Sequence, residues 1–221
     1  MHKVLLNGAD GKMGAMIADI IRNNPEYDLE VSVERTLANP DADGEFDIII
    51  DFSVPSAVEK AFELAKKRKK AYFTGVTGLS DEFLNKIKSE KSIPVFYAAN
   101  ASLGVFYFGK LIQFAKELYK DYDAAMREAH HIHKKDAPSG TAKTLAGLID
   151  FPYDKIISLR EGEIVGTHEV VFETPFEEIR LSHIAHNRKL FAESAVIEAV
   201  WLTKQKPGFY GVGDYYSSTR I

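Results

Sequence analysis

The first hundred residues alternate between short apolar runs and longer segments that have one apolar face. Strands are predicted at residues 3–7, 29–33, 46–52, 71–74 and 93–98, and the run FDIIIDF at 46–52 is apolar nearly throughout, as in a parallel strand buried on both faces. Helices are predicted between them, at residues 13–21, 56–70 and 81–89. Strands that alternate with helices in this way predict an α/β domain built on a doubly wound parallel sheet.

The pattern changes after residue 101. Residues 105–119 predict a long helix that is apolar nearly all round, so we expect it to be buried on more than one side. Strand patterns at 123–130, 163–173 and 177–185 are joined by short turns, and a helix is expected at 141–149. A last helix is expected at 194–204, followed by a tail rich in Gly and Tyr at 207–216. The second half therefore predicts an α+β domain with a mostly antiparallel sheet, after which the last helix returns to the first domain.

The composition excludes several classes of protein. The chain has 28 Lys and Arg against 32 Asp and Glu, a net charge of −4, whereas a nucleic-acid-binding protein is expected to carry a basic stripe. Without cysteine, disulfides and thiolate metal sites are excluded. No apolar stretch approaches the length of about 18 residues that a membrane span needs, and the first residues show no signal-peptide pattern. We therefore expect a cytoplasmic protein with no membrane or nucleic-acid partner.

A glycine-rich turn stands where the first predicted strand ends and the first helix begins. Its sequence is GADGKMG, residues 8–14, in which the glycines are spaced GxxGxxG and Asp10 replaces the second glycine of the standard dinucleotide fingerprint. Glycine permits a tight reversal and the close approach of a pyrophosphate, which the free N–H groups of a helix start can bind. The alternative is a tight strand–helix turn with no ligand.

The residues that follow the second predicted strand strengthen the nucleotide interpretation. Glu34 is placed to accept hydrogen bonds from the adenine ribose hydroxyls, and Arg35 can hold a 2′-phosphate with two hydrogen bonds. This pair predicts use of NADH and/or NADPH. Two later strand ends, at residues 74–78 and 98–101, belong to the same edge of the predicted sheet, and their small residues leave room for the nicotinamide and its ribose.

The segment EAHHIHKKDAPSGT, residues 128–141, concentrates positive charge in an otherwise acidic chain. A lysine beside a helix start is a suitable receptor for a carboxylate, and a neighbouring histidine is suited to donating a proton. Two alternatives compete with this interpretation. Three clustered histidines can form a zinc site, although other clustered ligands are missing, and a polar strand can simply face solvent.

The same segment, extended to EAHHIHKKDAPSGTA, resembles the signature of the dihydrodipicolinate reductase family, also called 4-hydroxy-tetrahydrodipicolinate reductase. The resemblance covers nearly the whole chain, because GADGKMG, IDFSVPSA, FTGVTGL and FYAANASLGV resemble further motifs of that family. Val54 departs from it, since many members carry a basic residue there, and Ala101 stands where an aromatic residue is frequent.

The resemblance implies a Rossmann-like first domain and a reduction with NADH and/or NADPH in the diaminopimelate route of lysine biosynthesis. It implies that His130 is the acid–base residue and Lys134 its partner in proton donation. The carboxylates of the substrate would be held by His131, Lys134, Ser139, Gly140, Thr141 and Arg188. The resemblance also implies the set of cofactor-binding residues, which is Gly8, Ala9, Asp10, Gly11, Lys12, Met13, Glu34, Arg35, Gly75, Val76, Thr77, Ala98, Ala99, Asn100 and Ala101. Residues 1–101 and 190–221 would form the dinucleotide-binding domain, and residues 102–189 a substrate domain whose sheet joins four copies into a homotetramer.

Three other functions remain possible from the residues alone. A different reductase, such as an aspartate or homoserine dehydrogenase, would share the glycine turn but would not be expected to carry the segment at 128–141. A nucleotide sensor would bind NAD(P)H without needing the histidines and lysines. A metal hydrolase would contain zinc in a stoichiometric amount relative to the protein.

Overall fold

The computed structural model describes residues 1–218 of the chain. Contacts between Cα atoms divide the chain into two compact units, one formed by Met1–Ala101 together with the segment from Lys189 onward, and the other by Ser102–Arg188. Each unit has its own sheet and its own buried apolar core.

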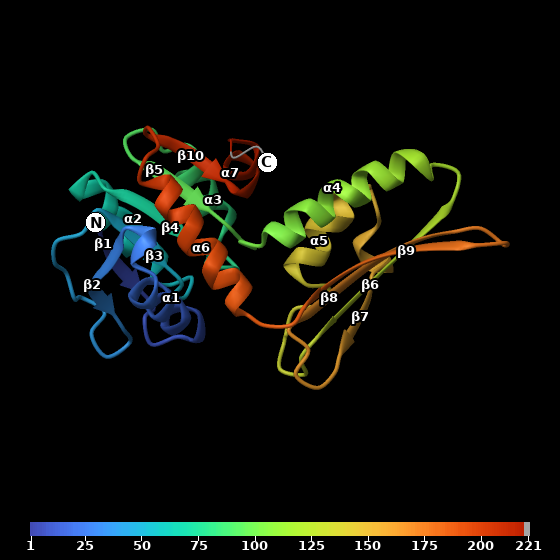
Figure 1. Ribbon diagram of the computed structural model, residues 1–221, viewed down its shortest axis with the longest axis horizontal. Coiled ribbons are helices and arrows are strands. Elements are labelled where there is room, and N and C mark those ends of the chain that lie inside the picture. The colour runs from blue at the N-terminus through green and yellow to red at the C-terminus, as the bar shows by residue number, and fades with distance from the viewer. Residues whose placement is uncertain (219–221) are drawn as a thin grey trace. The chain divides into compact units, whose positions relative to one another are not determined.

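The first unit is built on a parallel sheet of six strands in the order β10-β5-β4-β3-β1-β2 (Figure 1). The strands are β1 (His2–Asn7), β2 (Leu29–Arg35), β3 (Ile48–Asp51), β4 (Ala71–Thr74), β5 (Pro94–Tyr97) and β10 (Gly208–Gly211). Every neighbouring pair is parallel, which confirms the predicted doubly wound α/β architecture. The tail at 207–216 is more regular than expected, because β10 adds an edge strand beside β5.

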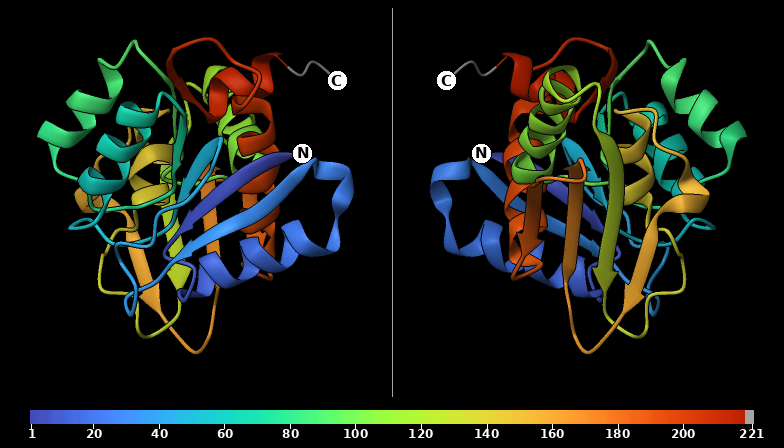
Figure 2. Two further views of the ribbon diagram at one scale, coloured as in Figure 1. Left: turned by 90° about the vertical axis from the view of Figure 1, so that its left-hand side faces the viewer. Right: turned by 90° about the vertical axis from the view of Figure 1, so that its right-hand side faces the viewer.

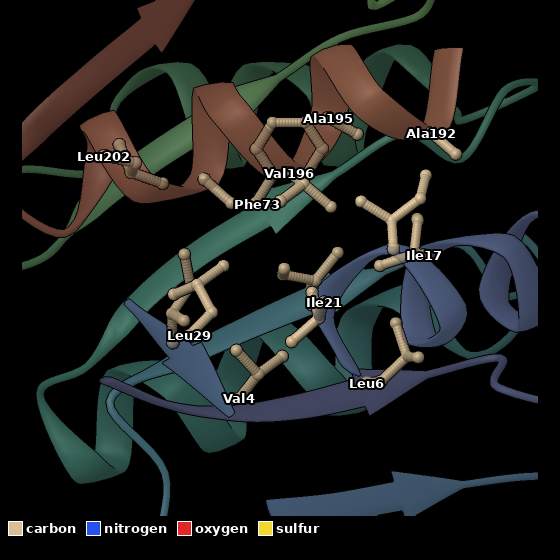
Figure 3. Packing of buried hydrophobic residues seen from close by; sticks show 14 of the residues in the cluster. Val4, Leu6, Ile17, Ile21, Leu29, Phe73, Ala192, Ala195, Val196 and Leu202 are labelled. Atoms are coloured by element: carbon tan, nitrogen blue, oxygen red, sulfur yellow. The ribbon is translucent and has the colours of Figure 1, made fainter. Parts of the chain in front are cut away.

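Helices cover both faces of this sheet. They are α1 (Lys12–Asn23), α2 (Val58–Arg68), α3 (Asp81–Lys88), α6 (Lys189–Leu202) and α7 (Val212–Ser218), with a 3-10 turn η1 (Pro25–Tyr27). The core on one face joins α1 and α6, with Ile17, Ala195 and Val196 fully buried against the strands (Figure 3). The core on the other face joins α2 and α3. α6 begins at Lys189, five residues earlier than predicted, and Ala192 in this added turn is fully buried, which explains why the helix extends there.

The second unit has a mixed sheet of four strands in the order β7-β6-β8-β9, seen side by side in the right-hand view of Figure 2. The strands are β6 (Asp123–His130), β7 (Ile157–Arg160), β8 (Gly166–Glu173) and β9 (Glu178–Ala185), and the helices are α4 (Leu103–Leu118), α5 (Gly140–Gly147) and the 3-10 turn η2 (Tyr153–Lys155). The β6–β8 and β8–β9 pairs are antiparallel, as predicted. β7 was not predicted, and it pairs with β6 in parallel. Its four residues, ISLR, are too few for a two-residue periodicity to stand out.

The long helix α4 corrects one expectation. Val105, Phe108 and Ile112 are buried in the core of the second unit, but Leu111 and Phe114 on the outer face are 59% and 60% exposed. Because one helix laid on a sheet buries only one side, the apolar residues on the other side stay uncovered within the chain. In residues 1–218, neither α4 nor any other helix is long and apolar enough to span a membrane.

Candidate active site

Two glycines of the turn after β1 cannot be replaced without moving the backbone. Gly8 has a φ of +84°, and a Cβ atom there would lie 2.7 Å from the carbonyl oxygen of Phe52. A Cβ atom on Gly14 would lie 2.1 Å from the carbonyl oxygen of Gly8. The backbone N–H of Gly8 donates to the carbonyl of Arg35 across a distance of 2.9 Å, which joins the turn to the end of β2. α1 begins at Lys12 without a side-chain cap from Gly11, so no side chain at the cap position competes with an anion for the first N–H groups of the helix.

A pocket of about 360 Å³ opens beside this turn, at the carboxyl ends of β1, β2 and β3. Its lining residues are Asn7, Gly8, Asp10, Gly11, Arg35, Thr36, Leu37, Pro40, Phe52, Ser53, Val54, Ser56, Ala57 and Lys60. Four of the predicted cofactor-binding residues, Gly8, Asp10, Gly11 and Arg35, are among them. Ligands of parallel α/β sheets bind at this edge, so the pocket fits the adenosine end of a dinucleotide.

Positive charge in this pocket comes from two side chains. The Arg35 guanidinium is 4% exposed and donates from Nε to the carbonyl of Pro40 at 2.7 Å, whereas its Nη1 is buried without a partner among the described residues. Lys60, on the first turn of α2, lies at the same pocket and forms an ion pair with Asp41. Sequence reasoning missed Lys60, because nothing local shows that this side of α2 faces the end of β2. A buried donor without a partner, beside a lysine, is suited to a phosphate group.

Other predicted cofactor residues of the first unit lie outside this pocket. Glu34 does not line it, and its carboxylate is paired with Arg22 of α1. Lys12 is exposed at the helix start, whereas Ala9 is buried and Met13 packs against the core.

The loops after β4 and β5 lie at the same edge of the sheet. A Cβ atom on Gly75 would lie 2.2 Å from the Phe52 ring, so the loop passes very close to β3. The side chains of Val76, Ala98 and Ala101 are buried in the two cores, so only the backbone of these three residues could contact a ligand. Thr77, Ala99 and Asn100 belong to the same two loops, and like the others they do not line the pocket at the ends of β1 to β3.

In the second unit, His130 ends β6 and is 8% exposed. Glu128 lies two residues earlier on the same face of the strand and is 1% exposed. Its Oε2 is hydrogen-bonded to Nδ1 of His130, and its Oε1 accepts a hydrogen bond of 2.8 Å from Nη2 of Arg160. Burial lowers the pKa of His130, while the hydrogen bond to Glu128 and its negative charge act in the opposite direction. Sequence reasoning missed the roles of Glu128 and Arg160.

The loop after β6 brings Lys134 and the start of α5 close to this pair. The Lys134 ammonium lies 2.7 Å from Oδ1 of Asp136. Ser139 is the N-cap of α5, because its Oγ accepts a hydrogen bond of 3.2 Å from the N–H of Ala142, and its own N–H donates to Oε1 of Glu128 at 3.3 Å. The predicted pair Gly140 and Thr141 therefore forms the first turn of α5, and Gly140 borders open space.

His131 and Arg188 belong to the same unit. Burial lowers the pKa of His131, and the positive charge of Arg188 lowers it further, so the two groups are near enough to interact. The His131 and His133 rings are 6.1 Å apart. Over residues 1–218, no three histidine or acidic side chains gather as a metal site.

His168 on β8 is a further polar residue that sequence reasoning missed. It is 5% exposed, its ring centroid lies 5.3 Å from that of His130, and its Nε2 lies 3.4 Å from Oγ of Ser139. Burial lowers its pKa to about 3, so the ring is neutral at ordinary pH. The strand alternation places it on the inner face of β8, but only the fold brings it beside His130.

Comparisons with known proteins identify the family of the chain. The family model described as "Dihydrodipicolinate reductase, N-terminus" matches residues 2–101, and the model described as "Dihydrodipicolinate reductase, C-terminus" matches residues 104–215. The 4-hydroxy-tetrahydrodipicolinate reductase of Campylobacter jejuni subsp. doylei is 34% identical over 244 residues, covering 100% of this chain and 98% of the relative. The enzyme of the same name from Rickettsia bellii is 36% identical, covering 96% of this chain and 94% of the relative.

A solved structure shares the fold. The dipicolinate-bound dihydrodipicolinate reductase from Paenisporosarcina sp. TG-14 superimposes with a TM-score of 0.73 at 20% identity, covering 96% of this chain and 97% of that chain. The two halves of the chain thus match the two family models, and the alignments cover nearly the whole length of these relatives. The chain belongs to the dihydrodipicolinate reductase family.

Proposed function

We propose that this chain catalyses the NAD(P)H-dependent reduction of 4-hydroxy-tetrahydrodipicolinate (dihydrodipicolinate) to tetrahydrodipicolinate. The reaction belongs to the diaminopimelate route of lysine biosynthesis, which we place in the cytoplasm. The observation that carries the proposal is the hydrogen-bond network at the end of β6. Glu128 contacts His130 and the N–H of Ser139 at the start of α5, and Arg160 joins Glu128 to the carbonyl of Lys134. The family membership and the nucleotide-type turn after β1 support it.

A nicotinamide, when bound, supplies the hydride that reduces the cyclic imine. The residues of the second unit supply the proton and hold the substrate. His130 gives a proton to the ring carbon next to the reduced one, with Lys134 as its partner. The substrate carboxylates are held by His131, Lys134, Gly140, Thr141 and Arg188, with Ser139 fixing the start of α5. Cationic groups and helix N–H groups stabilise the negative charge that develops on the ring and its carboxylates.

Substrate binding promotes the protonation of His130 that this role requires. In the free protein, burial lowers the pKa of His130, and the nearby positive charges of Lys134 and Arg160 lower it further, against the opposite effect of Glu128. A dicarboxylate bound beside Lys134 adds negative charge, which favours the imidazolium form. The substrate therefore raises the protonated fraction of the acid that acts on it.

For the cofactor, we propose that both NADH and NADPH bind. Arg35 and Lys60 would bind the 2′-phosphate of NADPH, which their position in the lining of the pocket supports, and Glu34 would turn from Arg22 to the ribose hydroxyls of NADH. We expect Glu34→Ala to lower kcat/KM for NADH more than for NADPH. Equal losses with the two cofactors would contradict this role of Glu34.

We also propose a homotetramer joined through the open face of the second sheet. The pairing register aligns Leu159, Ala129, Thr167 and Ile184 in one row across all four strands. Leu159 and Ile184 are 49% and 55% exposed, whereas α4 and α5 pack on the opposite face. An exposed apolar row of this kind is typical of an interface. Light scattering should give four copies for the wild type and fewer for Ile184→Lys; a monomeric wild type would contradict the proposal.

The decisive experiment is an assay of NADPH and NADH oxidation with freshly generated substrate. We expect oxidation that depends on the substrate, and release of tetrahydrodipicolinate in equal amount. A nucleotide sensor would bind the cofactor without oxidising it, and a metal hydrolase would contain stoichiometric zinc by elemental analysis. Either result would overturn the proposed function.

A further inference from the structure

Glu128 is buried in the second unit, and both of its carboxylate oxygens have partners. Oε2 is hydrogen-bonded to Nδ1 of His130, and Oε1 accepts from Nη2 of Arg160 at 2.8 Å and from the N–H of Ser139 at 3.3 Å. A buried carboxylate is costly unless it is fully hydrogen-bonded. This set of partners meets that requirement and ties the side chain to β6, β7 and the start of α5.

The state of Glu128 determines which nitrogen of His130 carries a hydrogen atom. Burial by itself raises the pKa of Glu128, but the hydrogen bonds from Arg160 and His130 outweigh it, and the pKa is lowered. An ionised carboxylate only accepts hydrogen bonds, so Nδ1 of His130 must be the donor. Neutral His130 is thereby held as the Nδ1–H tautomer, with a free lone pair on Nε2.

Nε2 of His130 is the ring nitrogen that Glu128 does not contact. Among residues 1–218, none of the side-chain hydrogen bonds described above involves this nitrogen. Gly166, the first residue of β8, lies next to it. A Cβ atom on Gly166 would lie 3.1 Å from Nε2, closer than side chains normally approach. The absence of a side chain at residue 166 leaves the space that a reacting atom next to Nε2 needs.

Arg160 connects this arrangement to the loop that carries Lys134. It stands opposite His130 in the parallel pairing of β6 with β7. Its Nη2 also donates to the carbonyl of Asp136, and its Nε donates to the carbonyl of Lys134 at 3.3 Å. One guanidinium therefore bonds both to the Glu128 carboxylate and to the backbone carbonyls of Lys134 and Asp136, whose side chains form an ion pair.

We infer that Glu128 and Arg160 are positioning residues of the reductase: Glu128 fixes His130 so that Nε2 delivers the proton, and Arg160 fixes Glu128 and the Lys134 loop. This rests on the proposed role of His130 as the acid. In the step, imidazolium His130 gives its Nε2 proton to the reduced ring and becomes the neutral Nδ1–H form, still bonded to Glu128. Water returns a proton to Nε2 before the next turnover. In a serine-protease triad, loss of the corresponding carboxylate costs about 10⁴-fold in kcat through the wrong tautomer.

The tautomer can be measured without any change to the buried network. In ¹⁵N NMR of the wild-type protein, with the His130 signals identified by their loss in His130→Gln, we expect Nδ1 to carry the hydrogen of the neutral ring. An Nε2–H tautomer would overturn the inference. The spectrum does not depend on activity, so a failure here is distinct from a failure of the proposed function, which the oxidation assay reports.

Glu128→Gln tests the consequence for catalysis. We expect kcat to fall about 10²–10⁴-fold, with the Kd for NADPH unchanged. The charged and titratable groups facing His130 are Glu128 on β6, Arg160 on β7, His168 on β8 and Lys134 in the loop. Loss of the Glu128 charge lowers the pKa of His130, so the basic limb of the kcat profile should move to lower pH. An unmoved limb would contradict the inference.

Three further variants complete the experiment. Glu163→Gln, at a side chain that is 85% exposed, is the matched control and should leave kcat and its pH profile unchanged. Gly166→Ala removes no polar group, and we expect it to lower kcat at least about tenfold by crowding Nε2. Arg160→Met should raise KM as well as lower kcat, because the Lys134 loop loses its tether. A Gly166→Ala enzyme with wild-type turnover would overturn the assignment of Nε2, even if Glu128→Gln failed to fold.

Discussion

Nη2 of Arg160 and Oε1 of Glu128 lie 2.8 Å apart, although the two residues are 32 positions apart in the chain. This contact joins the end of β7 to β6 behind His130, and the same guanidinium reaches the backbone of the Lys134 loop. The polar groups that we assign to proton transfer are therefore held together inside the second unit by its own sheet and loop.

His130→Gln should lower turnover about 10²–10⁴-fold, the usual contribution of a general acid. The Kd for NADPH, measured by the quenching of protein fluorescence, should not change, because the nucleotide-type turn belongs to the other unit. His133→Gln is the matched control, since the His133 side chain is 72% exposed, and it should retain wild-type kcat. Full turnover in His130→Gln would show that another group donates the proton.

Lys60→Gln should raise KM for NADPH about 3- to 10-fold, as expected for one lost contact between a surface ammonium and a phosphate. KM for NADH should not change, because NADH lacks the 2′-phosphate. The effect should shrink in high salt. Lys67→Gln, on an exposed position of the same helix, is the control. If Lys60→Gln affected the two cofactors equally, Lys60 would not contact the 2′-phosphate.

Glu198 on α6 should make the stability of the first unit depend on pH. It is fully buried, neither carboxylate oxygen has a partner among the described residues, and burial raises its pKa to about 8. Because the pKa of Glu198 in the folded chain lies above the usual value of 4.5, the stability that its neutral carboxyl group provides is fully present below pH 4.5. It is lost as the pH rises toward 8, by about 1.4 kcal/mol per pH unit.

Urea unfolding followed by Trp201 fluorescence measures this effect, because Trp201 is the only tryptophan and lies on the same helix. From pH 5 to 8, the free energy of unfolding of the wild type should fall relative to that of Glu198→Gln. Glu193→Gln, at a half-exposed side chain of α6, should follow the wild type. Parallel curves for wild type and Glu198→Gln would mean that Glu198 titrates normally.

Gly14→Ala should damage the nucleotide-type turn. A methyl group there would lie 2.1 Å from the carbonyl oxygen of Gly8, so the turn must move, and we expect a loss of about 1–3 kcal/mol in the free energy of unfolding. NADPH binding should weaken with it. In Gly211→Ala the nearest atom lies 3.9 Å away, and its unfolding midpoint should stay near that of the wild type. Unchanged NADPH affinity in Gly14→Ala would place the pyrophosphate elsewhere.

The sequence by itself determined the features that depend on neighbouring residues. The strand–helix alternation of residues 3–98 gave the parallel sheet, because local periodicity records which side of each segment is buried. Gly8 and Gly14 were recognisable because only glycine tolerates such close backbone contact. The segment 128–141 was recognisable because its charged residues stand together in the chain.

Only the tertiary structure decided which distant segments meet. Four residues of the tail become β10 because β5 offers an open edge, and β7 adds to β6 for the same reason. The folded chain likewise brings Arg160 to Glu128, Arg22 to Glu34, and Lys60 to the pocket. Such contacts depend on the total burial and hydrogen bonding of the folded chain, which no local pattern of residues records.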